Sequence, residues 1–451
     1  MADKALPLIS LPVSELGERL STGALSARQV ADAFLHQIEQ SEPAVKAFAH
    51  HDPDFVRFQA DAMDTHRRSG RPIGPLHGLP VGLKDIIDTA KIPTENGTAI
   101  DAGRVPLHDA WVVQRLKSAG AMIMGKTTTA ELAYLHPPQT TNPHDPERTP
   151  GGSSSGSAAA VAAGMVSLAV GTQTGGSVIR PAAFCGVTGF KPTFGAIPRT
   201  GILAQSPSLD TVGLFGQRPE DVARLGDVLF GYDPADPATT PAPPPRLHEI
   251  CTSAPPVPPV FAFIRPPGWD KADPQTHAAF EELAAALGEA QCFEIELPPH
   301  FADAADLRAR VNFVEMVKNY RRYLRAGPEH LSAELQDAVQ QGSATLAKDY
   351  LTALDWPDVL NSGLEEIFER ADAILTPATL GPAPKGLDST GDAIFNSLWT
   401  FIGTPAVTIP AMTSEEGLPM GVQLIGPRGE DARLLRSARW LLEWIETLSD
   451  A

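Results

Sequence analysis

Residues 150–193 read PGGSSSGSAAAVAAGMVSLAVGTQTGGSVIRPAAFCGVTGFKPT, and they contain two clusters of glycine and serine. The serines that anchor these clusters, Ser153 and Ser177, are 24 residues apart. Between them, residues 158–163 are small and apolar, which predicts a closely packed helix, and residues 166–170 predict a buried strand. Because a helix followed by a strand reverses the chain, we expect both clusters at one edge of a sheet.

The rest of the chain alternates between helical and strand-like patterns. Helices are predicted within 10–70 and 303–370 and at 110–119, 274–289 and 430–447. Strands are predicted near 78–87 and at 121–124, 261–264, 293–297, 373–376, 406–409 and 421–425. Strands that alternate with helices favour an α/β fold, and no internal repeat is evident.

We interpret residues 1–451 as a single domain. Its parts are N-terminal helices at 10–70, a core at 70–230 and a C-terminal α/β part at 261–451. The proline-rich residues 232–260 lie between the last two and are expected to form an extended surface connection, because such a composition cannot build a core.

The composition is that of a soluble globular protein: hydrophobic residues make up 43% and charged residues 20% of 451 residues. The formal net charge of −18 disfavours nucleic acid as a partner, because an acidic surface repels phosphates. The three cysteines form no Cys-x-x-Cys pair, and the N-terminus lacks a basic start followed by an apolar run. We therefore expect a protein of the reducing cytoplasm.

No segment is expected to cross or bind a membrane. The longest uncharged stretch, residues 149–179, is rich in Gly, Ser and Thr, and its apolar centre at 158–170 has only 13 residues. A transmembrane helix needs about 20 apolar residues. No cluster of metal-ligand residues is visible either, so neither a metal nor another cofactor is expected.

Three short motifs point to other chemistries, but their contexts argue against them. Residues 120–127 fit a phosphate-binding loop, yet the four middle residues are apolar and strand-like. Residues 152–156 fit the nucleophile elbow of α/β-hydrolases, but a polar loop precedes them instead of a strand. Cys185 lies in an apolar setting, where a thiol is more often inert packing than a nucleophile.

Thr174, Gly175, Gly176 and Ser177 follow a predicted strand, and the glycines let the backbone direct several N–H groups at one point. This is the outline of an oxyanion hole, although a plain glycine-rich turn has the same composition. Lys84 lies in another strand-like run. Its amine either reaches water or is desolvated, and a desolvated amine can serve as a general base for a serine.

Several motifs together closely resemble the amidase signature family of serine hydrolases. They are GLPVGLKD at 78–85, GKTTTAELA at 125–133, PGGSSSGSAAAVAAG at 150–164, GTQTGGSVIRPAAFCGVTGFKPTFG at 171–195, SLDTVG at 208–213, ILTPA at 374–378 and GTPAVTIPA at 403–411. The resemblance extends over residues 20–447. It implies a mixed, twisted central β-sheet that is covered by helices on both faces.

The resemblance also implies roles for individual residues. Ser177 is the expected acylating nucleophile, Lys84 the terminal base, and Ser153 the middle member of a Ser-cisSer-Lys triad. The N–H groups of Thr174 to Ser177 are the expected oxyanion donors, and Ser154 and Ser155 are expected to support the site by hydrogen bonds. Activity should rise from acid towards mildly alkaline pH, with a limb below the usual lysine value of roughly 10.4.

Gln173, Arg180 and Tyr134 are weaker candidates for substrate binding. Many family members, including the glutamine-hydrolysing subunit of tRNA amidotransferases, carry Asp where this chain has Gln173, and Gln resembles a malonamidase-like, free-standing branch. Arg180 could clamp a substrate carboxylate, or it could form a structural ion pair.

Apolar residues at the variable acyl pocket favour neutral aryl or alkyl amides, esters or carbamates, although plain helix packing would need the same residues. They are Tyr134, Leu135, Phe313, Met316, Tyr320 and Tyr323.

The sequence therefore predicts a cofactor-free enzyme that hydrolyses a small carboxylic amide through an acyl-enzyme, with carbamates and esters as further candidate substrates. Such an enzyme can form a homodimer. The alternative is the glutamine-hydrolysing subunit of an amidotransferase complex. A catalytically dead scaffold is disfavoured, because every triad position is occupied.

Overall fold

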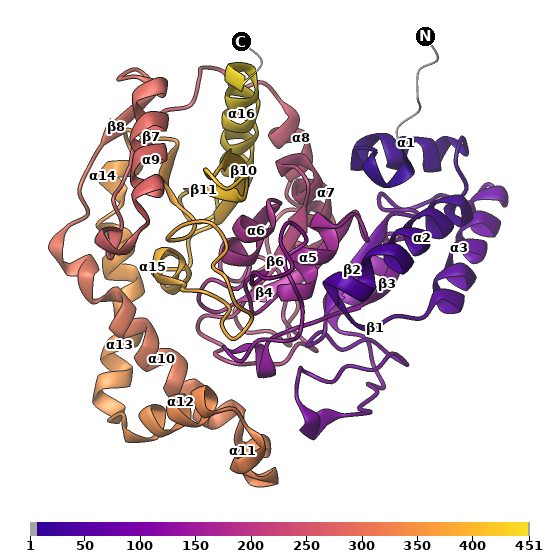
Figure 1. Cartoon of the computed structure of the whole chain (residues 1–451), viewed down its shortest axis with the longest axis horizontal. Helices are drawn as coiled ribbons and strands as arrows, with labels where there is room; N and C mark the ends of the chain where they lie inside the picture. Colours follow the sequence, from indigo (N-terminus) through magenta and orange to yellow (C-terminus); the bar gives the residue numbers. More distant parts are fainter. Residues whose placement is uncertain (1–6, 450–451) are drawn as a thin grey trace.

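The computed structural model describes residues 7–449 and contains one mixed sheet of 11 strands (Figure 1). In spatial order the strands are β1 (Phe48–His50), β3 (Met122–Thr127), β2 (Pro80–Lys84), β4 (Leu168–Gln173), β6 (Thr211–Gly216), β5 (Thr188–Lys191), β10 (Ala406–Thr413), β11 (Pro419–Ile425), β9 (Ala373–Pro377), β7 (Phe261–Phe263) and β8 (Cys292–Glu294). β2 lies between β3 and β4 and is parallel to both. The neighbouring strands in the series β4-β6-β5-β10-β11-β9 are antiparallel to one another. The predicted α/β fold with a mixed sheet is confirmed.

Helices cover both faces of the sheet. Those nearest its centre are α5 (Ser155–Ala162), α6 (Ile179–Cys185), α7 (Pro219–Leu229) and α16 (Asp431–Ser449). Two glycines of β6 locate the faces: a Cβ on Gly213 would meet Val178 beside α6, and a Cβ on Gly216 would meet Asp221 of α7. Because residues an odd number apart on a strand point to opposite sides, α6 and α7 lie on opposite faces.

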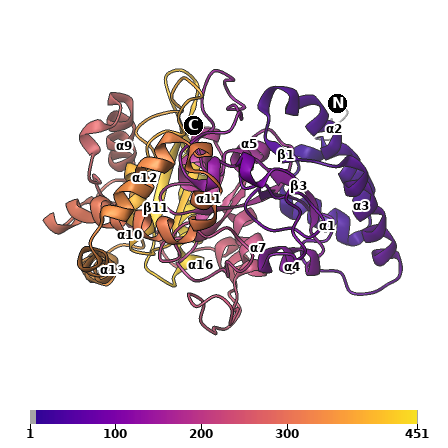
Figure 2. The same ribbon diagram turned by 90° about the horizontal axis from the view of Figure 1, so that it is seen from below.

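Two groups of helices flank the sheet at its ends (Figures 1 and 2). One end holds α1 (Val13–Thr22), α2 (Ala27–Val45) and α3 (Pro53–Arg68). The other holds α9 (Pro274–Leu287), α10 (Ala304–Asn319), α11 (Arg321–Ala326), α12 (Ala333–Ala344), α13 (Ala347–Ser362) and α14 (Glu365–Phe368). The remaining helices are α4 (Trp111–Ser118), α8 (Leu247–Thr252) and α15 (Ile394–Phe401). The predicted helical segments 10–70 and 303–370 are thus confirmed.

The proline-rich connection differs from the prediction, because it contains α8. Leu247 and Cys251 of this helix are buried, and the Asp227 carboxylate accepts hydrogen bonds from the first N–H groups of α8 at 2.6 and 3.1 Å. Two buried residues four positions apart and the capping carboxylate of Asp227 therefore allow a helix to form here despite the surrounding prolines. Within residues 7–449, the structure has no helix long and apolar enough to cross a membrane.

Helix α5 is fastened to β4 by serine hydroxyls. Thr172 N–H donates to Ser154 Oγ at 3.3 Å, and Ser157 Oγ donates to Val170 O at 3.3 Å. A Cβ on Gly156 would stand 2.2 Å from Ala47 O, so only glycine allows α5 to lie this close to the backbone of Ala47. These contacts fix how the two Gly-Ser clusters are placed relative to each other.

Candidate active site

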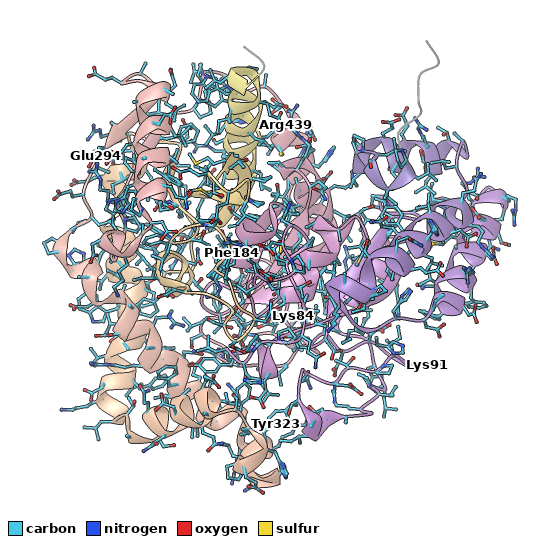
Figure 3. All side chains as sticks on the ribbon, in the orientation of Figure 1. Lys84, Lys91, Phe184, Glu294, Tyr323 and Arg439 are labelled. Atoms are coloured by element: carbon cyan, nitrogen blue, oxygen red, sulfur yellow. The ribbon has the colours of Figure 1, made fainter. Side chains whose placement is uncertain are left out.

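Lys84 is the last residue of strand β2, and its side chain is fully buried. In Figure 3 it lies near the centre of the molecule, whereas Lys91 lies at the periphery. Its Nζ donates to Ser153 Oγ at 2.8 Å and to Thr172 Oγ1 at 3.0 Å. The strand therefore holds the amine of Lys84 against the first Gly-Ser cluster.

The environment of Lys84 suits a base. Burial lowers the pKa of its amine from the usual 10.5 to about 7, while the nearby negative charge of Asp210 opposes this shift. An amine with this pKa is substantially neutral at neutral pH, and a neutral amine can accept a proton.

Ser153 is the serine of its cluster that bonds Lys84. The Gly152–Ser153 peptide bond is cis, as the family resemblance implies, and Ser153 O accepts a hydrogen bond from Ala130 N–H at 3.0 Å. Ser155 Oγ donates to Gly151 O at 2.7 Å, and Ser154 Oγ bonds backbone groups of β4. Ser154 and Ser155 therefore support the backbone, and Ser154 is not presented as a nucleophile would be.

The second cluster, residues 174–177, is a glycine-rich loop that ends at Ser177, and Ser177 is 8% exposed. The backbone N–H groups of Gly175, Gly176 and Ser177 donate to no other residue in the described part of the chain. A Cβ on Gly176 would stand 2.4 Å from Asn396 Oδ1, so α15 leaves no room for a side chain there. Free N–H groups beside a hydroxyl are what an oxyanion hole requires.

Gln173 holds this loop in place, so its predicted contact with substrate needs correction. Its Oε1 accepts from the N–H groups of Val178 and Ile179 at 2.8 and 3.0 Å, and its Nε2 donates to Thr400 Oγ1 at 2.9 Å. The Thr400 hydroxyl in turn donates to Gly175 O at 2.6 Å. The buried amide thus bonds three groups of the protein, and its oxygen caps the start of α6.

Arg180 has structural contacts, as one of its two predicted roles required, but they are hydrogen bonds and not an ion pair. Its guanidinium is buried, and Nη2 donates to Gly152 O at 2.6 Å and to Thr390 Oγ1 at 3.2 Å. It thus joins the two clusters through a backbone carbonyl, and it forms no ion pair with a residue of the described chain. Its Nε is buried without a partner among residues 7–449.

Asp210 lies in the motif at 208–213, but the sequence alone did not mark it as a site residue. Its Oδ1 accepts from Thr174 Oγ1 at 2.6 Å, and its Oδ2 accepts from Gln205 and Ser206 N–H, both at 2.9 Å. Burial raises the pKa of this carboxyl to about 6. Asp210 therefore fixes the start of the nucleophile loop and also acts electrostatically on Lys84.

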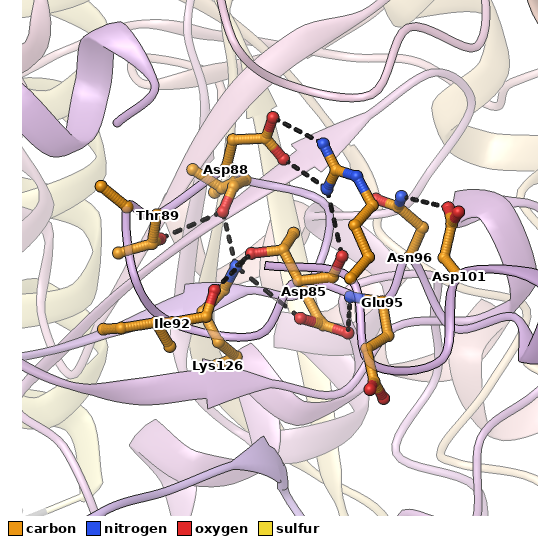
Figure 4. Close-up of polar contacts among 12 residues, drawn as sticks. Asp85, Asp88, Thr89, Ile92, Glu95, Asn96, Asp101 and Lys126 are labelled. Carbon is orange, nitrogen blue, oxygen red and sulfur yellow. Dashed lines mark hydrogen bonds and ion pairs between the residues drawn. The ribbon is translucent and has the colours of Figure 1, made fainter. Parts of the chain in front are cut away.

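The motifs at residues 120–127 and at Cys185 are structural. The apolar residues of the loop-like match form strand β3, and Figure 4 shows Lys126 enclosed by its neighbours. Lys126 Nζ donates to Ile87 O and Thr94 Oγ1 at 2.5 and 2.7 Å, so it does not face a phosphate site. Cys185 is buried and its Sγ donates to Pro150 O, and burial raises the pKa of its thiol.

Most of the apolar set belongs to one small hydrophobic core, against which Tyr134 and Phe313 also pack. Met316, Tyr320 and Tyr323 pack into a small hydrophobic core, in which Tyr320 OH donates to Leu132 O at 2.5 Å. These three residues correspond to helix packing rather than to a pocket lining. Tyr134 is half-buried and stacks edge-to-face on Phe313, with ring centroids 6.5 Å apart.

A cavity of about 160 Å³ adjoins the site on the side of Thr172, Thr174 and Asp210. Ile202 and Leu203 supply part of its apolar wall. The structure brings no group of three metal-ligating side chains together within the part of the chain it describes.

A sequence model of the family described as Amidase matches residues 29–435. The chain belongs to the amidase signature family. The chain is 34% identical to the A subunit of the glutamyl-tRNA(Gln) amidotransferase of Rhodopirellula baltica, with 94% of each chain covered. It is 36% identical to the corresponding protein of Symbiobacterium thermophilum, with 95% of each covered.

Solved structures share the fold of this amidase. A chain from a vestigial protein complex, described as revealing the evolutionary origins of an s-triazine catabolic enzyme, matches with a TM-score of 0.89 at 29% identity, covering 96% of this chain and 98% of that one. The native peptide amidase of Stenotrophomonas maltophilia matches with a TM-score of 0.84 at 28% identity, covering 98% of both chains.

Proposed function

We propose that this amidase hydrolyses a carboxylic amide through an acyl-enzyme on Ser177. The observation that carries the proposal is the buried amine of Lys84, which lies 2.8 Å from Ser153 Oγ and has a pKa of about 7. Such a base can take a proton from one serine hydroxyl and, through it, from a second.

The proposed reaction gives each of these groups a role. Ser177 Oγ attacks the amide carbon as its proton passes to Ser153 Oγ and the Ser153 proton passes to Lys84 Nζ. The N–H groups of Gly175, Gly176 and Ser177 stabilise the negative oxygen. As the C–N bond breaks, the proton returns along the same route to the departing amine. Water, activated by the same base, then hydrolyses the acyl-enzyme and releases a carboxylic acid.

Carbamates and esters are further candidates as substrates, because their carbonyls can form the same acyl-enzyme. The cavity beside Thr172 and Asp210 would receive the departing group. Its partly apolar wall suits ammonia or a small amine or alcohol.

The second candidate is the glutamine-hydrolysing component of an amidotransferase. The observation that favours it over a free-standing amidase is the identity of 34% and 36% to two such amidotransferase chains across almost the whole length. The internal role of Gln173 removes the sequence-based argument against this candidate, since that amide supports the loop rather than selecting a substrate.

One experiment separates the two candidates. The purified chain would be sized by gel filtration and assayed with L-glutamine and with a panel of simple amides, carbamates and esters. Turnover of simple amides by the isolated chain supports the free-standing enzyme. Turnover confined to glutamine, or appearing only with partner proteins added, supports the second. No turnover of any of them and no labelling of Ser177 by a serine-reactive sulfonyl fluoride would refute both.

A further inference from the structure

We propose that Arg308 binds a carboxylate on the acyl part of the substrate, so that the enzyme prefers monoamides of short dicarboxylic acids to neutral amides. This inference rests on the proposed function, because it places the carboxylate beside the acyl group that Ser177 would carry. It gives the substrate a chemical class that neither the fold nor the triad specifies.

The position of Arg308 supports this. It lies on α10, and its Nη1 is 3.4 Å from the point where a Cβ on Gly175 would stand. Ser397 Oγ of α15 is 3.9 Å from the same point. Since Gly175 precedes Ser177 by two residues, the guanidinium lies against the loop that would hold the reacting carbonyl.

Arg308 is also unsatisfied. It forms no hydrogen bond and no ion pair with any other residue of 7–449, and its Nε is sealed from solvent without a partner. Three other buried or half-buried arginines, Arg104, Arg148 and Arg199, each bond an aspartate at 2.7–3.0 Å, whereas Nε of Arg67 and of Arg180 is, like that of Arg308, buried without a partner. The half-buried side chain of Arg308 therefore carries a charge that the protein leaves uncompensated.

A ligand would supply the missing partner. Taking a charged group out of water is costly unless it is paired, and an arginine stays charged when it is buried. A carboxylate matches the two parallel N–H groups of a guanidinium, and such charge-assisted pairs are the strong hydrogen bonds of proteins. A site that keeps this fork empty in the unliganded protein is therefore suited to a planar anion.

The surroundings favour an anion as well. Arg180 lies close enough for the two positive charges to act on each other, with the negative charge of Asp392 also acting on Arg180, and Nη2 of Arg180 bonds Gly152 O and Thr390 Oγ1. Tyr134 lies beside Arg308, and burial raises the pKa of its phenol to about 12, which keeps it a neutral donor. In a protein of net charge −18, this is a local positive site. It reverses our expectation from the apolar residues that neutral substrates are preferred.

The test compares matched amides. Malonamic, succinamic and glutaramic acids would be assayed against propionamide, butyramide and valeramide, which have the same chain lengths and no carboxylate. We expect at least one acid to have a kcat/KM roughly ten times or more that of its neutral partner, and Arg308→Gln to lower it about 10- to 100-fold. The same variant should leave the neutral amide within about threefold.

Two further variants serve as controls. Arg310→Gln removes the same charge from an exposed position two residues along α10, and it should change the kcat/KM of neither the acidic nor the neutral amide. Arg308→Lys keeps the charge but loses the fork, and it should lie between the wild type and Arg308→Gln. Absence of any preference in the wild type, or an equal loss on acidic and neutral amides in Arg308→Gln, would overturn the proposal.

Binding to Ser177→Ala keeps the inference separate from the reaction. Calorimetry should show succinamic or glutaramic acid bound by Ser177→Ala and no longer bound after Arg308→Gln is added. This result would support the carboxylate site even if the wild type hydrolysed nothing, in which case the proposed function alone would fail. Lack of binding in both proteins, with neutral amides hydrolysed normally, would refute the carboxylate site alone.

Discussion

Replacing Lys84 with methionine should remove the base while keeping the volume of the side chain. Because the pKa of Lys84 is about 7, the wild-type kcat/KM should rise tenfold per pH unit in acid and level off above neutrality. About half of the amine is neutral at pH 7 and about 1% at pH 5, which predicts an activity roughly fiftyfold lower at pH 5. Lys84→Met should lose the limb and about 10²–10⁴-fold in rate.

The stability of Lys84→Met shows whether the loss is catalytic. The folded pKa of about 7 lies below the usual 10.5, so between these values the unfolded chain binds more protons and stability rises with pH. At pH 7 the buried amine therefore destabilises the fold. We expect Lys84→Met to melt at the same temperature as the wild type or higher, measured by circular dichroism.

Asp210 is the other group that could produce an acid limb, because its pKa is raised to about 6. Asp210→Asn separates the two. Loss of its negative charge lowers the pKa of Lys84 and should move the limb to lower pH, whereas the limb would disappear if Asp210 itself titrated. Lys191→Met is the matched control, because Lys191 is buried with a pKa of about 7 and lies outside the site. A limb that survives in Lys84→Met would refute the reasoning.

Three further changes test other parts of the site. Ser177→Ala should abolish hydrolysis and labelling by a sulfonyl fluoride without lowering the melting temperature, and continued turnover would exclude Ser177 as the nucleophile. Gln173→Met removes both hydrogen bonds to α6 and the one to Thr400, so kcat and melting temperature should fall together, and an unchanged kcat would contradict the positioning role. Cys185→Ala should keep full activity, and iodoacetamide should not inactivate the wild type, since the thiol is buried; rapid inactivation that Cys185→Ala prevents would argue otherwise.

Much of the fold could be predicted because its elements have strong local patterns. The capping box of α2 at Ser26 and Gln29 and the apolar run of β4 are visible in the sequence alone. The short strands β1 and β5 and the glycine-containing β6 were missed, because only pairing with neighbouring strands defines them.

The site divides in the same way. Ser153, Ser177 and Lys84 stand in motifs, so they could be named before the structure was known. The internal contacts of Gln173 and Arg180 could not be predicted, because a hydrogen-bonding side chain has the same letter whether it faces a ligand or the backbone. Arg308 gave no local signal at all, since the absence of a partner is a property of the folded chain and not of the helix that carries it.

The hydrogen bonds of Ser154 and Ser157 to β4 fix the position of helix α5 relative to this strand. Because these bonds fix α5 against β4, an insertion or deletion between Ser153 and Ser177 would displace one cluster from the other. Helix α10 instead bonds the residues just before Asp210: Glu315 accepts hydrogen bonds from Ser206 and Ser208. Changes in helices α10 to α13 that keep these bonds can therefore alter what the enzyme binds, while the spacing of Ser153 and Ser177 and the reaction that depends on it stay the same.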